Sequence, residues 1–308
     1  FRPGRLGLAT STVTGASFLG SGVALAAGGF IISRLPGTEF VTLPIVGEIR
    51  SWQLAFGFAS IPSVVFLTLF LFVREPARSG KLAQDDGGRS MFDALKYLRK
   101  DRAMWTSVFL GMAMIGAFQY GLTAWVPTFF IRSYGWNTAE IGQLYGAVFL
   151  ICGTSGTVTG GWLCDRLFKS FGRRTFVITP LLSASLSVPL VLVFALGGSG
   201  TVSAVMLVPL TFVGTMAFGA AIASIPSLAP NQIRGQLVAV YMLFSTIIGQ
   251  GCGPWVIAVF TEYVMGDPQA LNVSLGVVGA SLLALASLIL WGGARAISSS
   301  PVSAAQPG

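Results

Sequence analysis

The chain has 308 residues, of which 53% are hydrophobic and only 10% are charged, and its formal net charge is +8. Soluble domains carry about 25% charged residues, so this composition excludes an ordinary soluble protein and indicates a membrane protein. Histidine is absent, which removes the commonest general base and metal ligand.

A membrane-spanning helix needs about 20 mostly apolar residues, because only a helix satisfies its own backbone amides within lipid. Eight stretches of the chain meet this condition. In chain order they are Leu6–Ile32, Trp52–Val73, Met104–Phe130, Ala139–Leu163, Thr175–Leu196, Val202–Ile225, Leu237–Phe260 and Leu271–Trp291. The sequence therefore predicts an all-α polytopic membrane protein with eight transmembrane helices.

The basic residues are distributed unevenly between the predicted loops. If the spans alternate in direction, sixteen of the 19 Lys and Arg residues fall on one side, and only Arg34, Arg50 and Arg132 fall on the other. Cytoplasmic loops carry the excess of Lys and Arg. We therefore expect an integral protein of the bacterial inner membrane with both ends in the cytoplasm. The net charge is explained by this topology and predicts no nucleic-acid partner.

The sequence offers no candidate for catalysis or metal binding. Cys152, Cys164 and Cys252 lie in or at the ends of spans without paired spacing, so we interpret them as small packing residues. A membrane-embedded enzyme would need a buried nucleophile or base set, typically with His or paired Asp, and none is present. We expect no catalytic residue, no metal and no cofactor.

A weak internal repeat relates the first two spans to the last two. Arg5 and Arg234 each begin a span, and each is followed at +15 and +17 by glycine. Agreement by chance is the open alternative in a chain with 39 glycines. Read as a repeat, the pattern predicts four further helices ahead of residue 1.

The segment GGWLCDRLFKSFGRR, residues 160–174, carries a family resemblance. It resembles the loop between helices eight and nine of the major facilitator superfamily, with three extra residues before Gly172. The positions that match this pattern are Gly161, Asp165, Arg166, Gly172, Arg173 and Arg174. WQLAF (52–56), VREPAR (73–78) and PNQIRGQ (230–236) resemble other segments of the superfamily, and AWVPTFFIRSYGWNTAEIG (124–142) resembles the spinster-like branch.

This resemblance implies helices five to twelve of a twelve-helix transporter. Residues 1–74 would be the last two helices of the N-terminal half, without its first four, and residues 103–296 the C-terminal six-helix bundle. Residues 75–102 would be a cytoplasmic linker. Its end, capped by Ser90 and Asp93, reads either as a short amphipathic helix on the inner leaflet or as a solvated basic loop. Residues 297–308 are expected to be a disordered tail.

Transporters of this kind bind cargo near the middle of the membrane, between two halves that rock against each other. Polar residues inside the spans are therefore the candidates for a substrate cavity. They are Gln119, Tyr120, Thr123, Gln143, Tyr145, Tyr241, Ser245 and Gln250. Hydrogen bonding between packed helices uses the same residue types and is the alternative for each of them.

The sequence thus predicts a secondary active transporter that moves a small organic or amphipathic solute by alternating access, coupled to protons. The spinster-like resemblance points to a lipid-like cargo. It also places proton-linked charges on the first and fourth helices, which lie outside this chain. A facilitated carrier without ion coupling and a non-transporting receptor or scaffold are the alternatives.

A cytoplasmic gate is expected around the same charged loop. The fourth span is predicted to end near Asp165, where the negative end of the helix dipole disfavours a carboxylate. Asp165 would gain from amides at the start of the first span and from pairing with Arg5. Arg234 stands at the matching start of the seventh span. The alternative is that the charges of this loop fix only the topology.

Overall fold

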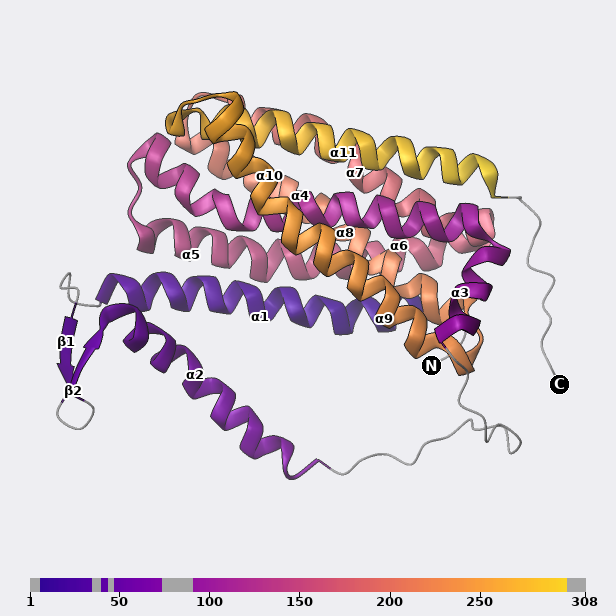
Figure 1. Ribbon diagram of the computed structural model, residues 1–308, viewed down its shortest axis with the longest axis horizontal. Coiled ribbons are helices and arrows are strands. Elements are labelled where there is room, and N and C mark those ends of the chain that lie inside the picture. Colours follow the sequence, from indigo (N-terminus) through magenta and orange to yellow (C-terminus); the bar gives the residue numbers. More distant parts are fainter. Residues whose placement is uncertain (1–5, 35–39, 44–46, 74–90, 298–308) are drawn as a thin grey trace.

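The computed structural model describes residues 6–34, 40–43, 47–73 and 91–297. Helices occupy all eight predicted spans (Figure 1). Two of the spans are interrupted by short π-helical segments, written η: one consists of α5, η2 and α6, and the other of α9, η5, α10 and η6. In chain order the helices are α1 (Leu6–Arg34), α2 (Ser51–Phe70), α4 (Arg102–Tyr134), α5 (Thr138–Val148), η2 (Phe149–Gly153), α6 (Thr154–Phe171), α7 (Thr175–Leu196), α8 (Gly200–Leu228), α9 (Arg234–Phe244), η5 (Ser245–Cys252), α10 (Gly253–Val259), η6 (Phe260–Val264) and α11 (Leu271–Ala296).

Seven helical stretches of the described residues are long and apolar enough to cross a membrane. The number is seven rather than eight because residues 138–196 form one run of 59 residues that holds two predicted spans. The run turns back at η3 (Gly172–Arg174), where Gly172 adopts φ +53°, a conformation that favours glycine. Close contacts show that α6 runs parallel to α8, because Gly156 lies against Phe212 and Gly160 against Met216. Helix α7 runs antiparallel to α8, because Ser183 hydrogen-bonds to Val213 and Ser203 to Phe194.

Two shorter elements lie between the spans. A hairpin of β1 (Phe40–Leu43) and β2 (Gly47–Arg50), which the sequence analysis did not anticipate, connects α1 to α2. The helix α3 (Met91–Lys100) precedes α4. The Tyr97 hydroxyl donates a hydrogen bond to the carbonyl of Leu228 at the end of α8, so α3 packs against the bundle. Ser90 lies outside the described residues.

One end of the bundle, here called the basic end, collects the start of α1, the start of α4, the turn at η3 and the end of α11. Among the described residues it carries most of the positive charge, namely Lys96, Arg99, Lys100, Arg102, Arg166, Lys169, Arg173, Arg174, Arg234 and Arg295. Of the basic residues in the described ranges, only Arg34, Arg50 and Arg132 lie at the opposite end. Ile297, which the sequence analysis assigned to a disordered tail, is buried at the basic end.

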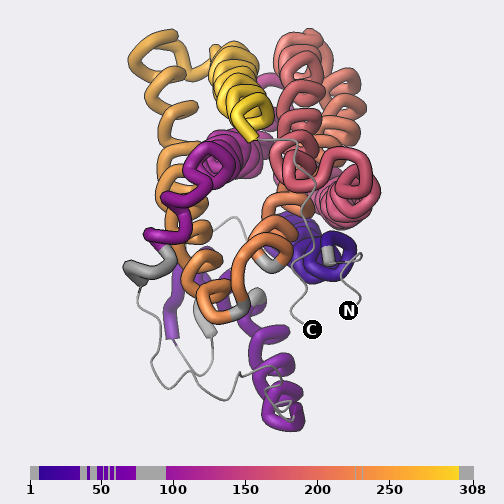
Figure 2. The backbone as a smooth tube through the Cα atoms, turned by 90° about the vertical axis from the view of Figure 1, so that its right-hand side faces the viewer, coloured from indigo at the N-terminus to yellow at the C-terminus, as the bar shows by residue number. Residues whose placement is uncertain are grey.

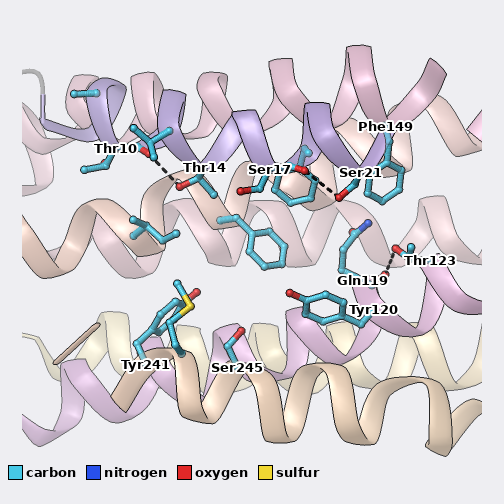
Figure 3. Close-up of a pocket in the computed structure, with 16 residues that line it drawn as sticks. Thr10, Thr14, Ser17, Ser21, Gln119, Tyr120, Thr123, Phe149, Tyr241 and Ser245 are labelled. Atoms are coloured by element: carbon cyan, nitrogen blue, oxygen red, sulfur yellow. Dashed lines mark hydrogen bonds between the residues drawn. The ribbon is translucent and has the colours of Figure 1, made fainter. Parts of the chain in front are cut away.

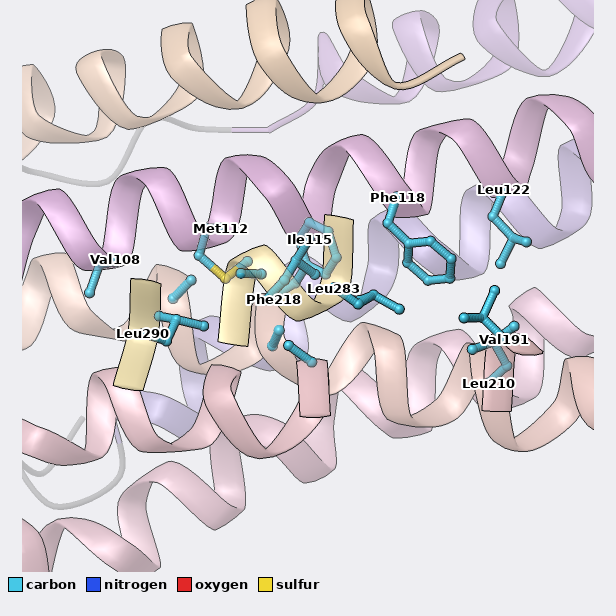
Figure 4. Packing of buried hydrophobic residues seen from close by; sticks show 14 of the residues in the cluster. Val108, Met112, Ile115, Phe118, Leu122, Val191, Leu210, Phe218, Leu283 and Leu290 are labelled. Atoms are coloured by element: carbon cyan, nitrogen blue, oxygen red, sulfur yellow. The ribbon is translucent and has the colours of Figure 1, made fainter. Parts of the chain in front are cut away.

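The hydrophobic core lies where α4, α7, α8 and α11 meet (Figure 4). Phe118 and Ile115 of α4 face Val191 of α7 and Leu283 of α11, and all four side chains are almost fully buried. Since lipid gives no hydrophobic drive between helices, this contact is stabilised by close packing of side chains. The core therefore holds these four helices of the α4–α11 bundle together.

Helix α1 packs along the whole of α5, η2 and α6 and forms a side wall of this bundle (Figures 1 and 2). Glycine permits the close approach: a Cβ on Gly22 would lie 2.5 Å from the backbone nitrogen of Leu150. A Cβ on Gly161 would likewise lie 2.2 Å from Ser11 Oγ. By contrast, the side chains of α2 that the structure describes are almost all exposed.

The packing predicts a large effect for one glycine of α6. A Cβ on Gly160 would lie 2.0 Å from the carbonyl oxygen of Met216 on α8, so Gly160→Ala should destabilise the bundle by about 1–3 kcal/mol through overpacking. Gly292→Ala on α11 is the control, because a Cβ there has no atom within 4 Å and Ala stabilises a helix relative to Gly. Thermal unfolding in detergent should show a lower Tm for Gly160→Ala only. Equal Tm values would contradict the packing.

Candidate substrate cavity and gate

A cavity of about 740 Å³ lies between α1 on one side and α4, α8 and α9–η5 on the other (Figure 3). Its volume is that of a site for a small organic ligand. The lining residues come from five segments that are far apart in the sequence. They are Ala9, Thr10, Val13, Thr14, Ser17, Phe18, Ser21, Gln119, Tyr120, Thr123, Phe149, Phe218, Ile222, Tyr241, Met242 and Ser245.

Helix α4 contributes the cluster Gln119, Tyr120 and Thr123, three of the eight cavity candidates that the sequence analysis named. Thr123 Oγ1 donates a hydrogen bond to the backbone carbonyl of Gln119 at 2.8 Å, so this hydroxyl proton is not donated to the Gln119 side chain. The Tyr120 ring lies beside Gly249 of η5, where a Cβ would be 3.3 Å from Tyr120 Cδ2. The absence of a side chain at Gly249 thus leaves space for the Tyr120 ring at the cavity wall.

Tyr241 and Ser245 line the facing wall, one turn apart on α9 and η5. Ser245 begins the π-helical segment η5, and Phe149 begins the π-helical segment η2 on another wall of the same cavity. Single-turn π-bulges inside α-helices are frequent at functional sites. Both of these bulges therefore border the space in which a ligand would lie.

The wall formed by α1 was missed at the level of the sequence. Thr10, Thr14, Ser17 and Ser21 follow one another at intervals of four, three and four residues and form a row along one face of the helix (Figure 3). Thr14 Oγ1 donates to the Thr10 carbonyl and Ser21 Oγ to the Ser17 carbonyl. The spacing was readable in the sequence and would have identified this row.

Three of the eight cavity candidates do not line the cavity. Gln143 is exposed on α5, and Gln250 is exposed next to Gly249, which is the residue that faces α4. Tyr145 is fully buried and packs edge-on against Phe149, with ring centroids 4.9 Å apart. Each successive residue turns by about 100° around a helix, so a polar residue next to an inward-facing one can point elsewhere.

Among the described residues, those that line the cavity carry no formal charge. None of the sixteen residues is Asp, Glu, Lys or Arg. Its polar groups are hydroxyls, phenols and one carboxamide, and they alternate with Phe18, Phe149 and Phe218. Such a lining suits an uncharged, partly apolar ligand, because an unpaired charge is costly in a low-dielectric interior.

Asp165 joins α6 to α1 at the basic end. Its Oδ1 accepts a hydrogen bond from the Gly7 amide at 3.0 Å, and its Oδ2 accepts one from the Leu8 amide at 2.9 Å. These amides belong to the first turn of α1, where the helix dipole favours a negative charge. Arg5 lies outside the described residues.

The expected end of the helix near Asp165 was wrong. α6 continues to Phe171, so Asp165 stands well inside its helix rather than at its C-terminus. Hydropathy detects the part of a helix that faces lipid, and the charged last two turns of α6 project beyond that part. The favourable environment of Asp165 therefore comes from α1 and not from relief of an unfavourable position on α6.

The other charged positions of this loop act within the bundle. Arg173 forms an ion pair with Asp101 at the start of α4, and Arg174 Nε donates to the Ile297 carbonyl at the end of α11, at 2.7 Å. Arg166 lies over the Trp162 ring. Arg234 Nε donates to the Ala229 carbonyl just before α9. The contacts of Arg173 and Arg174 hold helix ends of the bundle together, whereas Asp165 bridges to α1.

Comparison with known proteins decides the family. The model of the Major Facilitator Superfamily matches residues 1–254. The chain belongs to the major facilitator superfamily. It is 26% identical over 250 residues to an MFS-type efflux pump of Mycolicibacterium smegmatis, covering 80% of this chain and 57% of that protein. It is 24% identical over 170 residues to a galacturonate transporter of Dickeya chrysanthemi, covering 50% of this chain and 46% of that protein.

The fold is that of a solved transporter. The crystal structure of a bacterial homolog to the human lysosomal transporter Spinster, in an inward-facing and unoccupied conformation, matches with a TM-score of 0.61 and 20% identity. The match covers 95% of this chain and 67% of that one. At this identity the likeness shows the fold alone, and it confirms the all-α membrane fold that the sequence predicted.

The cavity predicts a pattern of chemical accessibility. With Cys152, Cys164 and Cys252 replaced by Ala, Tyr120→Cys and Ser245→Cys should react with a water-soluble maleimide, because both positions line the cavity. Ser274→Cys on α11 should stay unlabelled, since Ser274 is fully buried. Labelling is read by mass shift of the membrane-embedded protein. Equal reactivity at all three positions would contradict the assigned cavity.

Proposed function

We propose that this protein is a secondary transporter that moves a small, uncharged organic or amphipathic solute by alternating access. The observation that carries the proposal is the cavity, which lies between α1 and the α4–α11 bundle and has no charged group in its lining. Membership of the superfamily supports a transport function over a receptor or scaffold. The residues proposed to contact the cargo are Gln119, Tyr120, Thr123, Tyr241 and Ser245, together with the hydroxyl row of α1.

We infer that two bodies move against each other around this cavity. One contains α1 and α2 (within residues 1–74). The other is the predicted bundle of residues 103–296 and contains α4–α11, of which α4 begins one residue earlier, at Arg102; residues 75–102 are the predicted linker. Rocking of two such bodies around a central site is how related folds alternate access. The basic end is proposed to face the cytoplasm of a bacterial cell, because it carries most Lys and Arg.

We propose coupling to protons as the source of energy. The relative named as an efflux pump supports an energised step, since efflux against a gradient needs one. None of the residues that line the cavity is a carboxylate, so the coupling acid would lie elsewhere in the protein. The same observation favours the second candidate, a facilitated carrier in which no ion is coupled.

The gate at the basic end is proposed to be the Asp165 contact. The two hydrogen bonds to Gly7 and Leu8 join the two bodies beside the cavity. Charge-assisted hydrogen bonds contribute about 1.5–3 kcal/mol when partly shielded from water. They would therefore favour the conformation that is closed at the basic end.

Transport itself can be measured with the protein expressed from its complete gene. Proteoliposomes should take up or release uncharged amphipathic dyes faster than empty liposomes, and collapse of the proton gradient by an ionophore should abolish accumulation. Retained equilibration without accumulation would identify the facilitated carrier. Rates equal to empty liposomes for the whole dye panel would contradict the transport function.

A matched pair of carboxylates tests the gate. Asp165→Asn should weaken the contact with α1 and shift the closed–open equilibrium about 5- to 150-fold, the effect of 1–3 kcal/mol. Asp101→Asn breaks an ion pair that stays within the α4–α11 bundle and should leave the equilibrium unchanged. The readout is the rate at which Tyr120→Cys is labelled from the basic end in oriented vesicles. Equal labelling rates in Asp165→Asn and Asp101→Asn would contradict the gate and favour the alternative that the charges of this loop fix only the topology.

A further inference from the structure

The Gln119 carboxamide has no partner in the part of the chain that the structure describes. Gln119 is only 3% exposed, yet neither its Nε2 nor its Oε1 makes a hydrogen bond. Buried polar side chains are hydrogen-bonded in the great majority of cases, because an unmade bond costs free energy. A buried, unpartnered donor and acceptor at a cavity wall indicates that a ligand supplies the partner.

The surroundings of Gln119 keep this amide available. Gly214 of α8 lies behind it, and a Cβ there would come within 3.0 Å of Oε1. Thr123, the nearest polar residue on the same face, uses its hydroxyl on the Gln119 backbone carbonyl. The carboxamide therefore presents an N–H and a C=O side by side, in a plane, beside the cavity (Figure 3).

The α1 wall has the complementary property. Because Thr14 and Ser21 donate their hydroxyl protons to carbonyls of their own helix, they turn oxygen lone pairs toward the cavity. This wall consequently accepts hydrogen bonds more readily than it donates them. A ligand that spans the cavity would need donors on one side and a paired donor and acceptor on the other.

We propose that the cargo is a neutral amphipathic molecule with a cyclic amide or imide edge, an N–H beside a C=O, that pairs with the Gln119 carboxamide through two hydrogen bonds. The inference rests on the proposed function, because it takes the cavity as the cargo site. The uncharged lining disfavours a carboxylate or ammonium as the recognised group, and Phe18 and Phe218 would contact the apolar remainder of the molecule.

Two dyes that differ at one position test this pairing. 4-Amino-1,8-naphthalimide carries the imide N–H, and its N-methyl derivative has a methyl group in place of that donor. The protein, expressed from its complete gene and placed in lipid nanodiscs, should bind the N–H dye about fivefold more tightly by fluorescence anisotropy, the usual effect of one net hydrogen bond. Gln119→Met should reduce this ratio to about 1, because it removes the acceptor that the imide N–H would use. Gln143→Met, outside the cavity, should keep the ratio.

Three results would overturn the inference. These are a ratio unchanged in Gln119→Met, a ratio near 1 in the unmodified protein, and no binding of either dye by folded protein. The dye-binding test and the transport assay can fail independently of each other. Selective binding that depends on Gln119 without any transport would count against the proposed function alone, and transport without this selectivity would count against the inference alone.

Discussion

The structure depends on the contact between α1 and the continuous helix formed by α5, η2 and α6. Lipid does not press apolar helices together, so this contact relies on backbones that approach closely. Pairs of glycines make the approach: Gly29 faces Gly142, and Gly22 faces Gly146. If α1 moved away, the cavity would lose the wall that carries its hydroxyl row.

The same contact is built differently at its two ends. Away from the basic end it consists mainly of glycine faces, whose van der Waals contacts re-form easily after separation, with one long hydrogen bond of 3.4 Å from Thr154 Oγ1 to the Gly15 carbonyl near its middle. At the basic end the Asp165 carboxylate adds two directional hydrogen bonds to amides of α1. Separation at the basic end therefore breaks charge-assisted bonds, while separation at the other end breaks only packing. We propose that this asymmetry gives the gate a preferred closed side, and that it links the charged loop to the cavity.

The sequence was sufficient for the helices, because hydrophobicity over about 20 residues reflects immersion in lipid. It was less informative where that signal stops. Helix α6 runs on to Phe171 through charged residues, and strands of four residues, as in the hairpin, are too short for a periodic pattern.

The prediction of the cavity was limited because the sequence does not show which face of each helix points inward. Gln119 and Gln143 have similar apolar, glycine-rich neighbours, yet one lines the cavity and the other is exposed. Which of them faces inward depends on the helix packed opposite, and a single sequence does not contain that information. The row on α1 is different, since its spacing alone marks one face of a helix. Its hydroxyls pass for ordinary intrahelical hydrogen bonding until the facing wall is known.

The central claim is that α1 separates from α5–α6 at one end at a time. Double electron–electron resonance measures it directly, with one spin-label pair at Thr12 and Lys169 near the basic end and another at Ser33 and Gln143 near the opposite end, all on exposed positions. We predict that cargo and a proton gradient lengthen one distance while the other stays short, so that the two populations are anticorrelated. Distances that lengthen together, or that never change while transport proceeds, would contradict the account.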